Sequence, residues 1–334
     1  MHMTDSTRRR ALVSIIVLNY NGKHLLDDCI GSIQEQDYHA FEIIVADNCS
    51  EDDSVAYIRE RFPEVQVVEH PCNYGFSLGN NIAARQAKGR YFFFLNNDTR
   101  LDPHCLSALV DSVESNNADI CGCTVTDFEG ANHPLVMGCD FMGFPFQGRF
   151  FYVEGCALFI KRDSYYELDG FDEDYFMFYE DLDICWRARL AGKTISYVEE
   201  AVVRHKGGAT LSGGRPEHRG YTTNCQRRYL GERNNMRTLL KNYKLQTLLV
   251  VLPVYLFVNI LEIITLLIIG RNPKATCCYF KAYASNIVSL PKIMRTRRRV
   301  QASRKVGDLE IIRRMSFVPL KLKMLLKVGI PIIE

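Results

Sequence analysis

The stretch YFFFLNNDTRLDP, residues 91 to 103, decides the fold. It begins with five consecutive aromatic or apolar residues, a run that predicts a strand buried on both faces of a parallel sheet. The run then stops at Asn96, Asn97 and Asp98, three polar residues at the end of an otherwise buried strand. Ligands of open α/β sheets bind beyond the carboxyl ends of the strands, so this ending predicts a binding site.

The segments around this strand alternate between strand and helix patterns. Strands are predicted in ALVSIIVLNYNG (11–22), FEIIVADNCS (41–50) and VQVVEH (65–70), and helices in the segments 23–36, 50–62, 77–89 and 103–116. The first of these runs is short and lacks a small-residue cleavage pattern, which favours a strand over a signal peptide. Alternation at this spacing predicts an α/β fold, a mostly parallel sheet with right-handed crossovers and flanking helices.

Polar residues also end the first two predicted strands. Asn19, Tyr20 and Asn21 follow the first strand, and Asp47 and Asn48 follow the second. One such ending is ordinary turn chemistry, because Asn and Asp favour turns, but three on one rim favour a binding site. The chain has neither GxGxxG after the first strand nor GxxxxGK[ST] anywhere, which removes the main support for a dinucleotide site or a P-loop.

Composition narrows the class of protein. The 334 residues are 47% hydrophobic and 24% charged, enough for one large α/β domain with an appendage. The net charge of +2 argues against a nucleic-acid partner. Twelve cysteines stand at irregular spacings without a CxxC pair, which favours reduced cysteines in a cytosolic protein over disulfides or a zinc site.

The second half of the chain supplies a different set of groups. Glu180 and Asp181 stand at the start of the predicted helix in DLDICWRARLAG, where the helix dipole alone would account for two carboxylates. His205 follows the strand pattern YVEEAVVRH, and a single histidine of this kind is more often structural than a ligand.

These motifs together carry a resemblance. In order, VSIIVLNYNG, IIVADNCSEDDS, NYGFSLGNN, FFLNNDTRLDP, GFDEDYFMFYEDLDICWRARLAG and RHKGGAT resemble the motifs of inverting family 2 glycosyltransferases with the GT-A fold, particularly the rhamnosyltransferase-like branch. The resemblance covers about residues 11 to 210. It implies a GT-A catalytic domain over residues 11–230 and a helical, membrane-associated region over residues 231–334.

The resemblance implies a cation site at the end of the opening strand. Asp98 matches the DXD-type motif that holds a divalent cation, Mg²⁺ or Mn²⁺, against the donor diphosphate. Asn96 and Asn97 would then hydrogen-bond to the ribose or the diphosphate. His205 matches the family's histidine near the cation, and an imidazole among oxygen ligands favours Mn²⁺ slightly.

The donor-binding residues are likewise implied by the resemblance. Asn19, Tyr20 and Asn21 would contact the nucleoside, with Tyr20 stacking on the base, and Asp47 would accept hydrogen bonds from the pyrimidine or ribose. The donor side would also include Asn48, and the glycine-containing loop with Asn73, Gly75 and Asn80.

The chemistry follows from the family's ED motif. Asp181 matches its aspartate and would take the proton of the acceptor hydroxyl in an inverting transfer without a covalent nucleophile. Glu180 would orient the loop or the acceptor. The branch implies a nucleoside-diphosphate sugar donor, dTDP-rhamnose or a UDP-hexose, and a lipid-linked or polysaccharide acceptor.

Two other classes stay open at the level of sequence. A nucleotidyltransferase would share the nucleotide-binding sheet, but it would carry a glycine-rich basic loop after the first strand, and NYNGKHLL offers one lysine. A non-catalytic, membrane-bound sugar-nucleotide sensor would bind the donor without turnover.

Residues 248 to 269, LLVVLPVYLFVNILEIITLLII, are long enough to cross a bilayer. Pro253, Asn259 and Glu262 argue against a span, because an acid at the bilayer centre costs about 2.5–3.5 kcal/mol on insertion scales. Basic residues flank both ends: Arg233, Arg237, Lys241 and Lys244 before, and Arg271, Lys274 and Arg295 to Arg299 after.

These features predict a helix lying in the cytoplasmic leaflet of the membrane, with its basic neighbours on anionic headgroups. An ordinary buried core helix is the alternative. We also expect a truncation before residue 246 to release the catalytic domain from the membrane.

Overall fold

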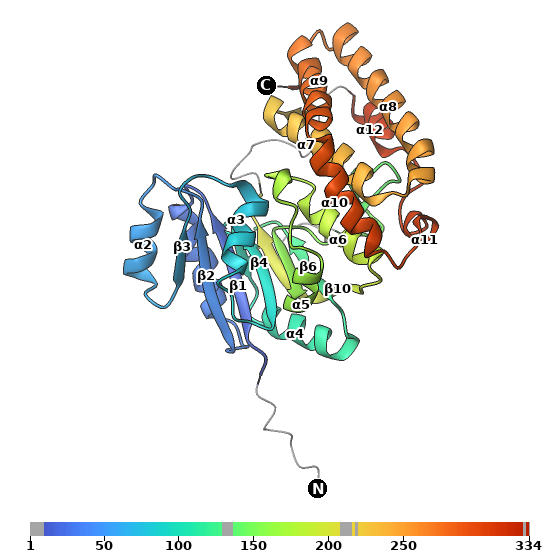
Figure 1. Ribbon diagram of the computed structural model, residues 1–334. Helices are drawn as coiled ribbons and strands as arrows, with labels where there is room; N and C mark the ends of the chain where they lie inside the picture. Colours follow the sequence, from blue (N-terminus) through green and yellow to red (C-terminus); the bar gives the residue numbers. More distant parts are fainter. Residues whose placement is uncertain (1–9, 129–135, 208–215, 218–219, 330–331, 334) are drawn as a thin grey trace.

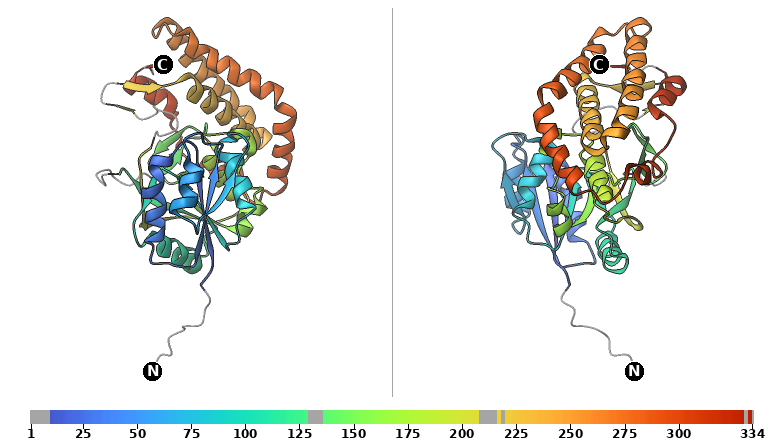
Figure 2. Two further views of the ribbon diagram at one scale, coloured as in Figure 1. Left: turned by 90° about the vertical axis from the view of Figure 1, so that its left-hand side faces the viewer. Right: turned by 45° about the vertical axis from the view of Figure 1, so that its right-hand side comes forward.

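A computed structural model describes residues 10–128, 136–207, 216–217, 220–329 and 332–333. A sheet with flanking helices forms the first part of the chain, and the C-terminal helices, orange to red in Figure 1, pack at one end of it. Both views in Figure 2 show the helical part packed against one end of the sheet part.

The main sheet has eight strands in the order β3-β2-β1-β4-β9-β6-β10-β5. Their bounds are β1 Val13–Asn19, β2 Phe41–Asp47, β3 Gln66–Glu69, β4 Tyr91–Asn96, β5 Thr99–Leu101, β6 Ile120–Thr126, β9 Ala157–Lys161 and β10 Ile195–His205. The strands β7 Met137–Cys139 and β8 Pro145–Gln147 form a separate hairpin. The helices of this part are η1 Lys23–Leu25, α1 Leu26–Gln34, α2 Ser54–Arg61, α3 Gly75–Ala84, α4 Cys105–Asn116, α5 Arg162–Glu167, η2 Glu173–Tyr175 and α6 Glu180–Leu190.

The strand β4 is buried on both faces, as its sequence predicts. Phe92 and Phe94 pack into one hydrophobic cluster, and Tyr91, Phe93 and Leu95 pack into the cluster on the other face. All five are at most 1% exposed. Alternate side chains of a strand point to opposite faces, so a run without polar residues is what this central position requires.

The pairing of the strands brings their polar ends to one edge. The strands β2 and β4 both pair in parallel with β1. The strand β9 is antiparallel to both β4 and β6, and β10 is parallel to β6, so β10 runs in the same direction as β4. Asn19, Asp47, Asn96 and His205 therefore end their strands at the same edge of the sheet.

The C-terminal part is helical and includes α7 Cys225–Asn242, α8 Leu245–Ile268, α9 Pro273–Val288, α10 Leu290–Ala302, α11 Asp308–Ile312 and α12 Leu320–Val328. The short strands β11 Pro216–Glu217, β12 Gly220–Thr223 and β13 Ile332–Ile333 form a small sheet of their own. The helix α7 runs across residue 230, the boundary that we expect between the two parts. The end of α7 is buried, with Asn242 at 0% and Lys241 at 1% exposure.

The helix α8 has one buried and one exposed side. Glu262, in the middle of its apolar sequence, is buried and forms ion pairs with Arg228 and Lys321. Asn259 accepts a hydrogen bond from the Lys321 ammonium at 2.6 Å. The outer side is apolar and exposed at Leu245, Leu249, Val250, Val254, Phe257, Ile260, Ile264, Leu267 and Ile268. Among the described residues, α8 is long and apolar enough to cross a membrane, judged by length and composition.

Three of the basic residues before α8 face the protein interior, contrary to the expectation that they lie on headgroups. Lys241 pairs with Asp172 and Asp183, and Arg237 is 4% exposed. The Arg233 guanidinium donates to the carbonyl of Tyr175 at 2.9 Å. The acids and carbonyls of the sheet part satisfy these charges, so they are not available to lipid. After α8, exposed basic residues remain at Arg271, Lys274, Arg295, Arg298 and Arg299.

All twelve cysteines are free, and eight of them are buried. Burial raises the pKa of the Cys29 thiol to about 12 and that of Cys121 to about 12. Such thiols stay protonated and behave as small apolar side chains.

Candidate functional site

The loops at the common strand edge are held together by side-chain amides. The Asn19 amide donates to Asp47 Oδ1 at 2.9 Å, and the Asn97 amide donates to Asn19 Oδ1 at 2.8 Å. A Cβ at Gly22 would lie 2.0 Å from Asn97 Nδ2, so the turn after β1 can approach only as glycine. The polar ends of β1, β2 and β4 therefore form one connected network, as the sequence predicts.

Asp98 and His205 meet at the centre of this edge. Asp98 Oδ1 lies 3.1 Å from His205 Nε2, and their side chains are 5% and 17% exposed. Burial opposes charge on both groups, but the hydrogen bond and charge of His205 hold the pKa of Asp98 below its usual value. The neighbouring Cys156 and Asp98 outweigh burial on the histidine and raise the pKa of His205 to about 11.

We tested whether these groups fit a divalent cation. The pair offers one carboxylate oxygen and, once a cation displaces the Nε2 proton of His205, one imidazole nitrogen; these ligands suit Mn²⁺ and, for the oxygen, Mg²⁺. Asn96 lies alongside, with its amide nitrogen 3.4 Å from His205 Nε2. Within the described part of the chain, no group of three or more His, Cys, Asp or Glu side chains is arranged around a common point. The donor set therefore fits a cation that takes its other ligands from a bound diphosphate.

Of the residues predicted to contact the nucleoside, Tyr20 and Asn21 are exposed. Tyr20 is 40% exposed, and Asn21 Oδ1 accepts the Glu51 N–H at 2.8 Å. Asp47 is 2% exposed and already accepts both the N–H and the hydroxyl of Ser50, at 2.8 and 2.7 Å. Asp47 thus shapes the loop after β2.

The other residues predicted to bind the nucleotide-sugar donor are mostly buried, and they contact the neighbouring loops. Asn48 is 2% exposed and bonds to the Gly75 carbonyl and the His70 ring, at 3.0 and 2.8 Å. Asn80 is 0% exposed and donates to a carbonyl one turn back in α3. Asn73 Oδ1 caps the Gly75 N–H at 2.8 Å. These side chains brace the loop between β3 and α3, and Gly75 has the positive φ of +73° that the turn requires.

Asp181 lies in the first turn of α6 and is half-buried. Its Oδ1 accepts the Leu182 N–H at 2.7 Å, and its Oδ2 accepts the Gly155 N–H at 3.1 Å. Burial raises the pKa of Asp181, and these backbone donors oppose the shift. The result is a carboxylate in fixed orientation that is more basic than an ordinary aspartate.

Glu180 lies deeper than Asp181. It is 6% exposed, and burial followed by the charge of Asp181 raises its pKa well above the usual range. Its Oε2 has no hydrogen-bond partner among the described residues. Two adjacent carboxyls with raised pKa values are typical of functional sites.

The loop before β9 links Asp181 to the Asp98–His205 pair. Gly155 donates to Asp181, while the carbonyl of the next residue, Cys156, accepts the Asn96 N–H at 3.1 Å. The Cys156 thiol lies beside the His205 imidazole. Adjacent Cα atoms are 3.8 Å apart, so the carboxylate of α6 and the pair at the sheet edge share one site. Sequence analysis missed this loop, VEGC, because no charged motif marks Gly155 or Cys156.

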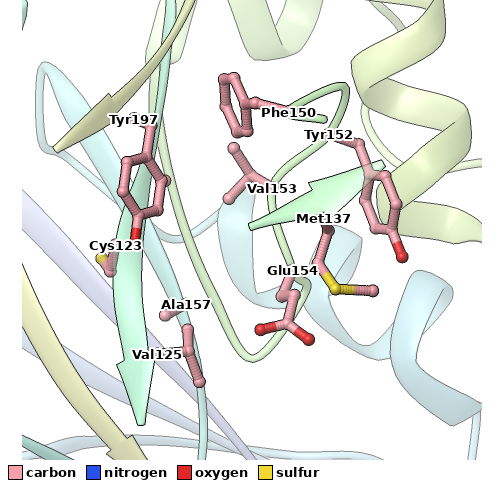
Figure 3. Close-up of a pocket in the computed structure, with 10 residues that line it drawn as sticks. Cys123, Val125, Met137, Phe150, Tyr152, Val153, Glu154, Ala157 and Tyr197 are labelled. Atoms are coloured by element: carbon pink, nitrogen blue, oxygen red, sulfur yellow. The ribbon is translucent and has the colours of Figure 1, made fainter. Parts of the chain in front are cut away.

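A small cavity lies behind this loop. Figure 3 shows Val153 and Glu154 on the loop, with Tyr197 of β10 across the cavity. Its volume is about 10 Å³, room for about one water molecule. A nucleotide sugar therefore needs the open strand edge rather than this cavity.

Of the predicted residues, the structure joins Asn19, Asp47 and Asn97 by hydrogen bonds. It pairs Asp98, the residue after Asn97, with His205, and it bonds Asp181 to the loop before β9. Residues 208 to 210 of the RHKGGAT motif lie outside the described residues.

Comparison with known proteins identifies the family. The profile "Glycosyl transferase family 2" matches residues 14–165. The profile "Glycosyl transferase family group 2" matches residues 91–280, more than half of the chain. The chain belongs to glycosyltransferase family 2. The resemblance on which the motif analysis rests is thereby confirmed.

Curated family 2 relatives include enzymes of bacterial glycan synthesis. The rhamnosyltransferase WbbL of Escherichia coli is 25% identical over 215 residues, 56% of this chain and 80% of WbbL. A β-1,3-glucosyltransferase of Campylobacter jejuni, named for a GalNAc(5)-diNAcBac-PP-undecaprenol substrate, is 30% identical over 122 residues, 35% of this chain and 40% of that enzyme. The O-antigen biosynthesis protein RfbC of Myxococcus xanthus is 26% identical over 61% of this chain but only 18% of its own length. For the last two relatives, the chain spans well under half of their length.

Solved structures show the GT-A-like fold. A mannosyltransferase of Pyrobaculum calidifontis, solved with GDP-mannose and Mn²⁺, has a TM-score of 0.52 at 17% identity, over 88% of this chain and 86% of its own. Staphylococcus aureus TarS 1–349, solved with UDP, has a TM-score of 0.52 at 18% identity, over 69% and 66%. At such identity the likeness concerns the fold, and it confirms the predicted α/β fold of family 2.

Proposed function

We propose that this protein transfers a sugar from a nucleoside-diphosphate donor with inversion at the anomeric carbon, and that Asp181 is its general base. The observation that carries the proposal is the Asp181 carboxylate, which accepts the N–H of Leu182 in α6 and the N–H of Gly155 on the loop that also reaches the Asp98–His205 pair. Inversion needs one base on the acceptor side and no covalent nucleophile. This arrangement supplies one such base.

Residues of α6 and of the loop before β9 would deprotonate the acceptor hydroxyl and orient the acceptor. Asp181 receives the proton of the acceptor hydroxyl as that oxygen attacks the anomeric carbon. Its raised pKa favours proton acceptance, and general-base assistance is typically worth ~10²–10⁴ in rate. Glu180, buried next to it and with no hydrogen-bond partner for its Oε2 among the described residues, would orient the loop or the acceptor.

The donor diphosphate would lie at the Asp98–His205 pair. We propose that Asp98 and His205 hold a divalent cation, Mg²⁺ or Mn²⁺, with Asn96 and Asn97 beside the diphosphate. When bound, the cation neutralises the charge of the departing nucleoside diphosphate. Mn²⁺ in the solved relatives supports a cation of this kind.

The donor sugar is proposed from the relatives. The match to WbbL over 80% of its length favours rhamnose carried by dTDP, with UDP-hexoses as the second candidate. The name of the Campylobacter enzyme supports a lipid-linked glycan as acceptor. Tyr20, 40% exposed, would stack on the pyrimidine.

We further propose that the protein attaches to the cytoplasmic face of the membrane through the outer side of α8. That side is apolar and exposed, while Glu262 and Asn259 face inward and are paired. A helix with this division lies in the interface rather than across it. Arg271 and Lys274, exposed after α8, would face anionic headgroups.

A nucleotidyltransferase would need basic groups for a triphosphate after β1. There the structure has Lys23, whose N–H bonds to Asp52. A sensor without turnover would not need Asp181 fixed by two backbone donors. Both classes are therefore weaker proposals than a transferase.

The proposal is tested with purified protein, a bacterial lipid extract and a panel of dTDP-, UDP- and GDP-sugars. We expect nucleoside-diphosphate release that needs both one donor and the lipid extract. Release of pyrophosphate from a nucleoside triphosphate would indicate the nucleotidyltransferase, and tight donor binding without release would indicate the sensor.

A further inference from the structure

The segment that leads into Glu180 and Asp181 has a strained backbone. Phe176 has φ 61° and ψ −60°, and the N–H of Met177 donates to the carbonyl of Tyr175 at 2.6 Å. These angles and this bond define the γ-turn of the rare, strained kind.

The strain continues to Tyr179, the residue just before α6. Phe178 and Tyr179 have φ values of 69° and 72°, in the left-handed region that bulky side chains avoid. A residue in such a region is strained, and its conformation persists only where its surroundings hold it. Something outside the segment must therefore fix its shape.

The outside support comes from one side chain of α7. Asn234 is 0% exposed, and its amide nitrogen lies within hydrogen-bond distance of three carbonyl oxygens of the segment. The three carbonyls are those of Tyr175 at 3.0 Å, Met177 at 2.8 Å and Phe178 at 2.8 Å.

The orientation of this amide is fixed by its other end. Asn234 Oδ1 accepts the Nε–H of Arg233 at 2.9 Å, so a reversed amide would set an oxygen against three carbonyls and an NH₂ against a guanidinium. Arg233 and Arg237 add donors to the carbonyl of Asp174, at 3.1 and 2.9 Å. Side chains of α7 thus hydrogen-bond to the backbone of the segment that leads into α6.

The segment also contacts the start of α3, at Gly75 and Phe76. The N–H of Phe76 donates to the Phe176 carbonyl, and a Cβ at Gly75 would lie 2.4 Å from that same oxygen. A shift of the segment would therefore move Asp181 relative to the loop between β3 and α3.

We propose that Asn234 is a positioning residue for the acceptor-side base: by holding the strained segment 175–179, it sets where α6 presents Asp181. The inference rests on the proposed role of Asp181. It adds that a residue of the helical part, with no contact to the reacting atoms, controls the rate of transfer.

The test compares Asn234→Ala with Asn235→Ala. Asn235 is the next residue of α7, is 3% exposed, and faces the turn at Gly143 instead of the strained segment. Asn234→Ala should lose more thermal stability than Asn235→Ala, because Asn234 makes several buried hydrogen bonds and Asn235 Oδ1 makes none, so kcat is compared well below both thermal transitions. Asn234→Ala should lower kcat by about 10- to 100-fold, as a misplacement of the order of 1 Å does. Its affinity for the nucleoside diphosphate, measured by calorimetry with Mn²⁺, should stay within about twofold of the wild type.

The double variant Asn234→Ala/Asp181→Asn separates positioning from general damage. If Asn234 acts through Asp181, its loss should add little to that of Asp181→Asn, because residues that act as a unit are not additive. Equal kcat in Asn234→Ala and Asn235→Ala, or a full further loss in the double variant, overturns the inference. If Asn234→Ala does not fold, Asn234→Ser, which keeps one donor, is measured against the same control and on the same criteria. Near-normal transfer by Asp181→Asn would instead reject the proposed base itself.

Discussion

At the scale of residues, the Asp98–His205 pair sets the expected dependence on metal. Replacing either Asp98 or His205 leaves the proposed cation with one protein ligand. We expect Asp98→Ala and His205→Ala each to weaken Mn²⁺-dependent binding of the nucleoside diphosphate at least tenfold, measured by calorimetry. Binding without Mn²⁺ should change much less.

Arg204→Ala is the matched control for this prediction. Arg204 adjoins His205 on β10, but it pairs with Asp102 away from the site. Transfer that EDTA leaves unchanged would contradict the cation.

The buried Asp181 sets the expected pH dependence of transfer. A base must be deprotonated to accept a proton, so the rate falls as the pH drops through its pKa. Because burial raises the pKa of Asp181, the acid limb of kcat should lie above the pH at which an ordinary aspartate titrates. A kcat that stays constant down to pH 4 would contradict this assignment.

The sequence predicts the charged residues of the candidate site, but not the uncharged residues that position them. Asp98, Asp181 and His205 carry charge at the ends of recognisable elements. Gly155 and Asn234 act through a backbone N–H and a buried amide. Their roles depend on which loops meet in space, and no periodicity records that.

At the scale of elements, the outer side of α8 sets the expected attachment to membranes. Leu249, Val250 and Phe257 are 68%, 68% and 60% exposed. Full burial of one such side chain is worth roughly 1.5–3 kcal/mol. Replacing all three with Gln should lower binding to vesicles of anionic lipid more than tenfold in a sedimentation assay, with little change in thermal stability.

Leu309→Gln on α11 serves as the control, because Leu309 is 74% exposed but lies on another helix. Full retention of vesicle binding by the triple variant would show that α8 is not the attachment site.

The elements themselves were largely predictable. The strands β1, β2 and β4 and the helices between them follow from apolar runs and helical spacing. The sequence of α8 contained Asn259 and Glu262, which read as obstacles to a membrane helix. Their partners, Arg228 and Lys321, lie in α7 and α12, so their compensation was not visible from the local pattern.

At the scale of the molecule, the helical part and the sheet part share a core. Val300, Ile311 and Met315 belong to the same hydrophobic cluster as Ile16 of β1. The buried Asp140 accepts the Leu320 N–H at 2.9 Å. We therefore expect a chain ending at residue 245 to be insoluble or unfolded, contrary to the release that the sequence suggests. Soluble expression with a cooperative thermal transition would contradict this.

The joint between the two parts also explains why a boundary at residue 230 is hard to draw. The helix α7 begins before it and ends with Lys241 paired to Asp172 and Asp183 of the sheet part. From the sequence, the basic residues of this segment are expected to contact lipid headgroups. In the fold, Lys241 instead pairs with acids of the sheet part.

The central claim, that Asp181 removes the acceptor proton, is tested most directly by single-turnover transfer with Asp181→Asn. Asparagine keeps the shape and one acceptor oxygen but cannot take a proton. Its NH₂ group replaces the oxygen that accepts the Gly155 N–H, so we expect a modest loss of thermal stability, and transfer is measured well below the thermal transition. We predict wild-type affinity for the nucleoside diphosphate and a transfer rate lower by ~10²–10⁴. A rate within a few fold of the wild type would contradict the account.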